Sequence, residues 1–148
     1  MISFRQSFSY DLESITIGPP STVLARVQSL RQIGGFSSNL SVSADWDFNQ
    51  RIARNFHVHY IDKILVNYRV HPNNMSNNVD LYYKEMKLAI FSNFVEFRLK
   101  KSDLRLSLSK LNLIMAGEKW KKRSISFFKY LMVSLFYDMR ITLKRIIN

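Results

Sequence analysis

The chain has 148 residues with 47% hydrophobic content, which suits one compact domain or one half of a larger one. It contains no Cys, so disulfides, thiolate nucleophiles and cysteine-ligated zinc are excluded, and a reducing cytoplasm fits. Most of the net charge of +11 arises in residues 98–148, which carry thirteen Lys and Arg against three Asp and Glu, so the high pI does not by itself indicate a nucleic-acid binder.

The N-terminal segment carries no sign of export. Its sequence, MISFRQSFSYDLES, lacks the cationic start, long apolar run and small-residue cleavage site of a secretory signal. Extended backbone is predicted over residues 14–17 and 22–26, because β-branched side chains cluster on both sides of a Gly-Pro-Pro turn.

Two short helices are predicted next. The first covers residues 27–33 and ends at a Gly-Gly pair, which tolerates the positive φ of a helix C-cap. The second covers residues 44–54, because Ser43 is a favourable N-cap and apolar side chains follow at near-helical spacing, namely Trp46, Phe48 and Ile52. Asp45 and Asp47 then fall in the first turn of the second helix.

Two strands are predicted over residues 56–61 and 64–69. Polar and apolar side chains interleave in both segments, and an Asp-Lys turn separates them. The predicted topology of this part of the chain is therefore mixed α/β.

The remainder of the chain is predicted to be helical. One helix starts near residue 80, a second covers about 103–117, and a third starts near residue 124 and continues toward the end. Apolar residues cover most of the third helix, and one face collects Ile125, Phe128, Met132, Phe136, Met139 and Leu143. Such a helix is expected to be buried in protein or lipid, although its longest apolar run is too short to span a bilayer.

The two aspartates are the first candidates for chemistry. At a helix start they lie near unsatisfied backbone N–H groups and the positive end of the helix dipole, which favours their ionised forms. An ionised Asp that faces a pocket can act as a general base and take a proton from an attacking hydroxyl. The alternative is that both acids only cap the helix and complement its dipole.

Other candidates flank this pair. Trp46 can present an aromatic face to a sugar ring or can belong to the core. The segment Tyr68-Arg69-Val70-His71 ends a predicted strand and leads into a polar loop. There, His71 can bind a metal or phosphate, and Arg69 can pair with anionic oxygens. The alternative for His71 is a solvated or backbone-bonded imidazole.

The order GGF, DWDFNQRI and YRVHPNNMS resembles the C-terminal half of the family 2 glycosyltransferases. The similarity covers about residues 15–77, and the combination is far more specific than any one motif. The resemblance implies an inverting enzyme that transfers a sugar from a nucleotide-sugar donor to an acceptor hydroxyl. The fold it implies is GT-A, so we expect an α/β fold with a partial mixed sheet and flanking helices, followed by a helical C-terminal region.

The resemblance also assigns roles to residues. Asp45 matches the catalytic base, and His71 matches a position that in some members helps to bind a divalent metal, Mn²⁺ or Mg²⁺. Arg51 matches the Arg of that helix and, with Trp46, Asp47 and Arg69, is expected to support the acceptor or donor site. The chain has Ala44 where the family usually has Glu, which leaves Asp45 as the candidate base.

The nucleotide-binding half of the family, with its metal-binding Asp-x-Asp, would precede residue 15 and is not part of this sequence. The DWD motif does not replace it, because this motif lies between GGF and YRVH on the acceptor side. We therefore expect residues 1–78 to be the acceptor-side half of a glycosyltransferase domain and residues 79–148 to be a basic helical extension. Efficient turnover would need a complementary donor-binding half, since inverting transfer depends on holding both substrates in line.

Three functions stay open on this basis. The first is a glycosyltransferase part that acts in surface polysaccharide or glycolipid synthesis, in the cytoplasm or peripherally on the inner face of the membrane. The second is a catalytically silent remnant or interaction module. The third is a peripheral protein whose basic amphipathic tail binds an anionic membrane surface, the alternative being a solvated basic face. Nucleic acid is not expected as a partner, because no recognised nucleic-acid-binding module is present.

Overall fold

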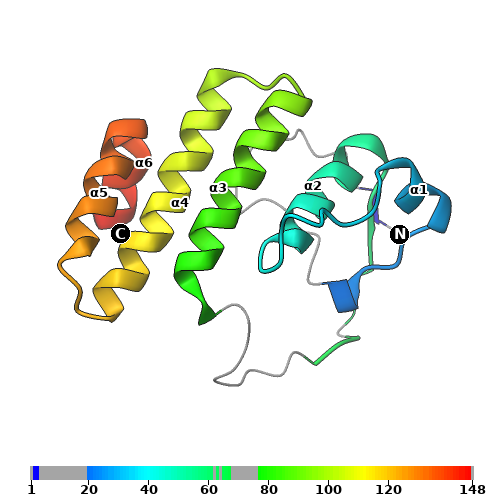
Figure 1. Cartoon of the computed structure of the whole chain (residues 1–148), viewed down its shortest axis with the longest axis horizontal. Coiled ribbons are helices and arrows are strands. Elements are labelled where there is room, and N and C mark those ends of the chain that lie inside the picture. The colour runs from blue at the N-terminus through cyan, green and yellow to red at the C-terminus, as the bar shows by residue number, and fades with distance from the viewer. Residues whose placement is uncertain (1, 4–19, 62, 64, 68–76, 148) are drawn as a thin grey trace.

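The computed structural model describes residues 2–3, 20–61, 63, 65–67 and 77–147. In chain order the elements are β1 (Ile2–Ser3), the 3-10 turn η1 (Pro20–Thr22), α1 (Val27–Gln32), α2 (Ala44–Asn55), β2 (His59–Tyr60), α3 (Val79–Glu96), α4 (Lys101–Lys121), α5 (Ser126–Tyr137) and α6 (Met139–Ile147). Figure 1 shows α3, α4 and α5 as a row of helices, with α6 beside α5 at one end and α1 and α2 at the other. The described part of the chain is therefore mainly helical.

The expected α/β fold class with a partial mixed sheet is wrong. The β structure of the described residues consists of β1 and β2, two residues each, paired antiparallel with Ile2 opposite Tyr60. The strand predicted over 56–61 is thus reduced to two residues, and residues 65–67 of the second predicted strand have no regular structure. Alternating side chains favour a strand, but a sheet also requires neighbouring strands to complete its hydrogen-bond ladders, and this pair offers few such bonds.

The helix predictions fare better. Those over 27–33 and 44–54 correspond to α1 and α2, and those from residues 80 and 103 correspond to α3 and α4. The extended segment expected at 22–26 instead begins inside η1, and the one at 14–17 lies outside the described residues.

The helix predicted from residue 124 to the end is in fact two helices that meet at Asp138. The backbone of Asp138 is extended, with φ −154° and ψ 102°, which ends α5. Its carboxylate then accepts hydrogen bonds from the backbone N–H groups of Arg140, at 3.0 Å, and Ile141, at 3.3 Å. Asp138 is therefore the N-cap of α6, and this local bond competes successfully with a continuous helix.

The core lies between α3 and α4. Met86 and Ile90 of α3 meet Leu108 and Leu111 of α4, and all four side chains are almost completely buried. Partly buried side chains surround this cluster, namely Trp46, Tyr82, Tyr83, Leu104 and Tyr137. Trp46 brings α2 into contact with the same core.

A buried row of hydroxyl groups joins α4, α5 and α6. The Oγ atoms of Ser109 and Ser134 are 3.0 Å apart, and Ser134 Oγ lies 2.8 Å from Thr142 Oγ1. All three residues are fully buried. Because their side chains are small and satisfy one another, α5 can approach α4 closely without leaving unpaired polar groups.

The core predicts a contrast between two leucines. Leu111→Ala removes a fully buried side chain and should lower the free energy of unfolding by about 2–5 kcal/mol, since it loses apolar burial and leaves a cavity. Leu88→Ala on α3 is the matched control, because Leu88 is 55% exposed and its loss should change stability by less than about 0.5 kcal/mol. Urea unfolding followed by circular dichroism measures both, and equal effects would contradict the assigned core.

Candidate functional site

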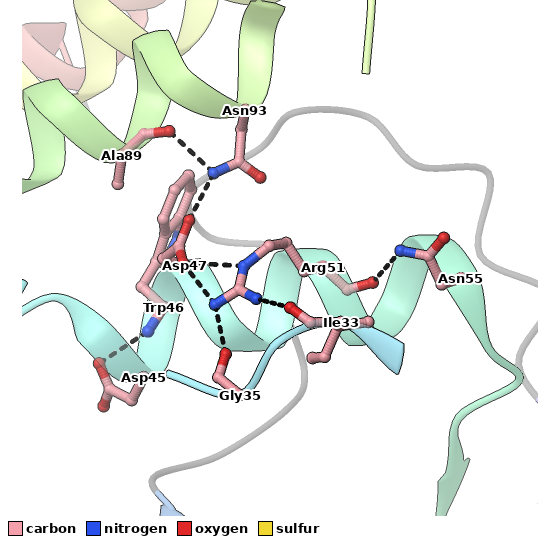
Figure 2. A network of polar contacts seen from close by, with 9 residues as sticks. All are labelled: Ile33, Gly35, Asp45, Trp46, Asp47, Arg51, Asn55, Ala89 and Asn93. Carbon is pink, nitrogen blue, oxygen red and sulfur yellow. Dashed lines mark hydrogen bonds and ion pairs between the residues drawn. The ribbon is translucent and has the colours of Figure 1, made fainter. Parts of the chain in front are cut away.

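The buried pair Asp47 and Arg51 lies at the centre of the motif region. Arg51 is one helical turn after Asp47 on α2, and its Nε and Nη2 atoms lie 3.0 Å and 2.9 Å from Asp47 Oδ2. The other carboxylate oxygen, Oδ1, accepts a hydrogen bond of 2.8 Å from the side-chain amide of Asn93 on α3. Figure 2 shows Asp47 between these two partners. Both oxygens of Asp47 are thus engaged inside the protein.

Arg51 also holds the GGF turn. Its guanidinium donates hydrogen bonds to the backbone carbonyls of Ile33 and Gly35, the latter at 2.7 Å (Figure 2). Both glycines of the turn have positive φ, 74° at Gly34 and 69° at Gly35, a conformation that side chains with a Cβ rarely adopt. GGF and DWDFNQR are therefore joined into one structural unit. The sequence showed only that the two motifs are close along the chain.

An aromatic contact completes this unit. Phe36, the third residue of GGF, stacks on Phe48 of α2 with ring centroids 4.4 Å apart and an interplanar angle of 21°. We name the set formed by Ile33 to Phe36, Asp47, Phe48 and Arg51 the turn clamp. The clamp fixes the α1–α2 connection against the helix that carries Asp45.

Asp45 differs from Asp47 in its surroundings. It is half-buried, and its Oδ1 accepts a 2.7 Å hydrogen bond from the backbone N–H of Trp46. Its second oxygen makes no hydrogen bond or ion pair with any residue in the described part of the chain. In Figure 2 its side chain points away from the turn clamp. The two acids of the DWD motif therefore have separate roles, one structural and one available to a ligand.

Tyr82 of α3 is a neighbour of Asp45 that the sequence did not indicate. Burial raises the pKa of the Tyr82 phenol, and the negative charge of Asp45 raises it further. Tyr82 therefore stays protonated at neutral pH and presents a neutral hydroxyl within the field of the Asp45 carboxylate.

Trp46 serves the core in this structure. Its ring packs against the α3–α4 cluster, so the core interpretation of Trp46 is the one that the contacts favour over a sugar platform. Its indole N–H is buried and makes no hydrogen bond with the described residues.

The segment that leads into α2 is held by a residue that lies far away in the sequence. Ser43 occupies the N-cap position, as predicted, but its side chain makes no capping hydrogen bond. Instead Glu85 of α3 accepts hydrogen bonds from the backbone N–H groups of Ser41, at 2.9 Å, and Ser43, at 3.0 Å, and from Ser41 Oγ at 2.6 Å. Burial alone would raise the pKa of Glu85, but these hydrogen bonds outweigh it and lower the pKa. The separation of more than forty residues explains why no local pattern pointed to Glu85.

Two predicted site residues, Arg69 and His71, lie outside the described residues. Among those that are described, no group of three or more His, Cys, Asp or Glu side chains could hold a metal ion. The metal expected from the resemblance stays a prediction.

The described part of the chain also forms a shallow pocket of about 300 Å³. It is lined by Gln32, Ile33, Arg51, Asn55, Phe56 and Glu96, and Asp45 is not among these residues. The pocket therefore lies beside the turn clamp and not at the candidate base.

Comparisons of the chain with known protein families, with curated proteins and with solved structures found no match. The resemblance to the family 2 glycosyltransferases therefore rests on the motifs alone.

Breaking the ion pair of the turn clamp should be costly. Asp47→Asn leaves the Arg51 guanidinium buried without its counter-charge, so the free energy of unfolding should fall by about 3–5 kcal/mol. Glu118→Gln is the control, because the Glu118–Lys121 pair lies on the surface of α4 and should contribute less than about 1 kcal/mol. Urea unfolding compares the two, and a similar small loss in both would contradict the role of the clamp.

The contacts of Glu85 predict a pH dependence of stability. Because folding lowers the pKa of Glu85, its contribution is present above the ordinary value of 4.5 and is lost as the pH falls through the folded value. Glu85→Gln should therefore be less stable than wild type by about 1–3 kcal/mol at pH 7, and this difference should shrink below pH ~4. Glu96→Gln, at an exposed position of α3, is the control. A difference that does not change between pH 7 and pH ~3 would contradict the prediction.

Proposed function

We propose that this chain supplies the acceptor side of a glycosyltransferase site in which Asp45 is the general base. The observation that carries the proposal is the division of roles within DWD. Asp47 is occupied by Arg51 and Asn93, whereas Asp45 lies in the first turn of α2 with one carboxylate oxygen free of partners among the described residues. The motif resemblance assigns the base to this same residue.

The reaction would proceed by a single displacement. The acceptor hydroxyl oxygen attacks the anomeric carbon of the donor sugar, and the bond from that carbon to the phosphate oxygen breaks on the opposite face. Asp45 takes the proton of the hydroxyl as the new carbon–oxygen bond forms, and the nucleoside diphosphate leaves with the electron pair. The configuration at the anomeric carbon is inverted.

The turn clamp would serve this reaction by positioning the base. General-base catalysis requires the carboxylate to lie within hydrogen-bond reach of the proton, so small displacements of the helix start are costly. Arg51 and Asp47 fix α2 against the GGF turn, which would give the order of these two motifs along the chain a physical reason.

The donor side of the site is expected from a complementary half. The chain contains a single Asp-x-Asp, the DWD motif itself, and Asp47 of that motif is buried in the turn clamp. A nucleotide sugar with its metal ion would therefore be held mainly by another polypeptide segment, and the acceptor would belong to surface polysaccharide or glycolipid synthesis.

The test combines the chain with the nucleotide-binding half of a family 2 glycosyltransferase and measures sugar transfer or nucleotide-sugar hydrolysis in the presence of Mn²⁺ or Mg²⁺. Asp45→Asn keeps the shape of the side chain but removes its basicity, so turnover should fall by about 10²- to 10⁴-fold. Asp103→Asn is the matched control, because Asp103 also lies in the first turn of a helix, α4, and should leave turnover unchanged.

Equal turnover of wild type and Asp45→Asn would refute the base assignment. If neither protein shows turnover, calorimetry of the chain with nucleotide sugars and Mn²⁺ or Mg²⁺ is the further measurement, because metal-dependent binding by the chain would count against a silent module.

A further inference from the structure

A row of large apolar side chains is exposed on α5 and α6. Their exposed fractions run from 43% to 86%, and the residues are Ile125, Phe128, Met132, Phe136, Met139 and Leu143. Trp120, near the end of α4, is also 65% exposed. We name these seven residues the apolar face. On α5 the exposed side chains recur at helical spacing and so share one side of the helix, and large exposed apolar groups of this kind are typical of interaction sites.

α5 exposes apolar side chains on the side that a usual surface helix leaves polar. Its one fully buried residue is a serine, Ser134, which faces the hydroxyl row of α4 and α6, and the partly buried Tyr130 and Tyr137 pack toward α3 and the core. By helical spacing, Phe128, Met132 and Phe136 lie on the opposite side. A surface helix normally buries its apolar stripe and exposes its polar residues, so this arrangement is favourable only if something apolar covers the outer side.

The charges around the apolar face are mainly positive. Besides Lys121, which pairs with Glu118, five cationic residues of this region are exposed, namely Lys122, Arg123, Lys129, Arg140 and Lys144. The acidic residue between them, Asp138, is occupied as the N-cap of α6. A covering surface must therefore be apolar inside and anionic at its rim, which describes a bilayer containing anionic phospholipids.

We propose that the apolar face docks on the surface of a membrane rich in anionic phospholipid, with α5 and α6 lying in its plane. Phe, Ile, Met and Leu side chains would enter the boundary between headgroups and acyl chains, and the five cations would contact lipid phosphates. No helix in the described part of the chain is long and apolar enough to cross a membrane. A second copy of the chain fits less well, because it would bring the same cations together. This inference does not depend on the proposed glycosyl transfer.

The experiment measures co-flotation of the full chain with vesicles of phosphatidylcholine alone and with vesicles that also contain phosphatidylglycerol. Binding should require phosphatidylglycerol and should weaken with added salt. The triple variant Phe128→Ser, Met132→Ser, Phe136→Ser should lower binding at least about tenfold, since it removes three inserted side chains. The matched control is Leu88→Ser, Phe91→Ser, Val95→Ser, which removes exposed apolar residues from α3 and should bind like wild type.

A second pair of variants tests the charges. Lys122→Gln with Arg123→Gln should lower partitioning by roughly fivefold for each charge removed, whereas Lys84→Gln with Lys87→Gln on α3 should have little effect. All these positions are exposed, so circular dichroism should show unchanged folding. Equal binding to both vesicle types, or equal binding of the α5 variant and wild type, would overturn the proposal. A third outcome would also overturn it: the wild-type chain self-associates in light scattering, the α5 variant does not, and neither protein binds vesicles.

Discussion

The arrangement of the N-terminal part depends on one carboxylate, that of Asp47. One of its oxygens binds the Arg51 guanidinium and the other binds Asn93, so a single side chain connects α2 to its own next turn and to α3. The Arg51 guanidinium that Asp47 binds also donates hydrogen bonds to the backbone carbonyls of Ile33 and Gly35. A guanidinium has five donors in a fixed plane, and here it uses them on a carboxylate and two carbonyls at once. The GGF turn, α2 and α3 therefore hold one another in a fixed geometry.

The joint between α2 and the row of helices is mainly polar. Two buried residues of α3 make the polar contacts: Glu85 bonds the backbone of Ser43, just before α2, and Asn93 bonds Asp47 in the first turn of α2. Trp46 adds an apolar contact with the core. These two anchors are eight residues apart, which is about 12 Å along a helix. Buried polar contacts contribute little net stability for their number, but each is satisfied only in one orientation. The polar contacts between α2 and α3 therefore fix the orientation of α2 and with it the position of Asp45. Apolar contacts alone would define this orientation less well.

Sequence patterns predicted the elements whose cause is local. The Gly-Gly stop after α1, the start of α2 at Ser43 and the helical periods of α3 and α4 all depend on residues within a few positions of one another, and all were confirmed. The sheet could not be predicted from alternation, because strands depend on partners from elsewhere in the chain. The break at Asp138 competes with a strong helical pattern, and Glu85, which holds the segment before α2, belongs to a distant helix. At the candidate site, the resemblance assigned Asp45 and Asp47 different roles, but the residues alone could not show that Asp47 is buried, since that burial arises from its contacts with Arg51 and Asn93.

The exposure of the apolar face follows from how α4, α5 and α6 pack. Ser134 bonds both Ser109 and Thr142 through its hydroxyl group, which fixes the Ser134 side of α5 toward α4. The sequence alone showed a helix with apolar residues around most of its circumference and left its buried side undecided. If α5 were rotated to bury Phe128, Met132 and Phe136, their volume would separate the helices and the hydroxyl groups would lose their partners. The interior contact therefore places Ser134, with the partly buried Tyr137, toward the core and leaves Phe128, Met132 and Phe136 outside. An apolar surface that covers these three side chains would be favourable, and the cations beside them limit what that surface can be.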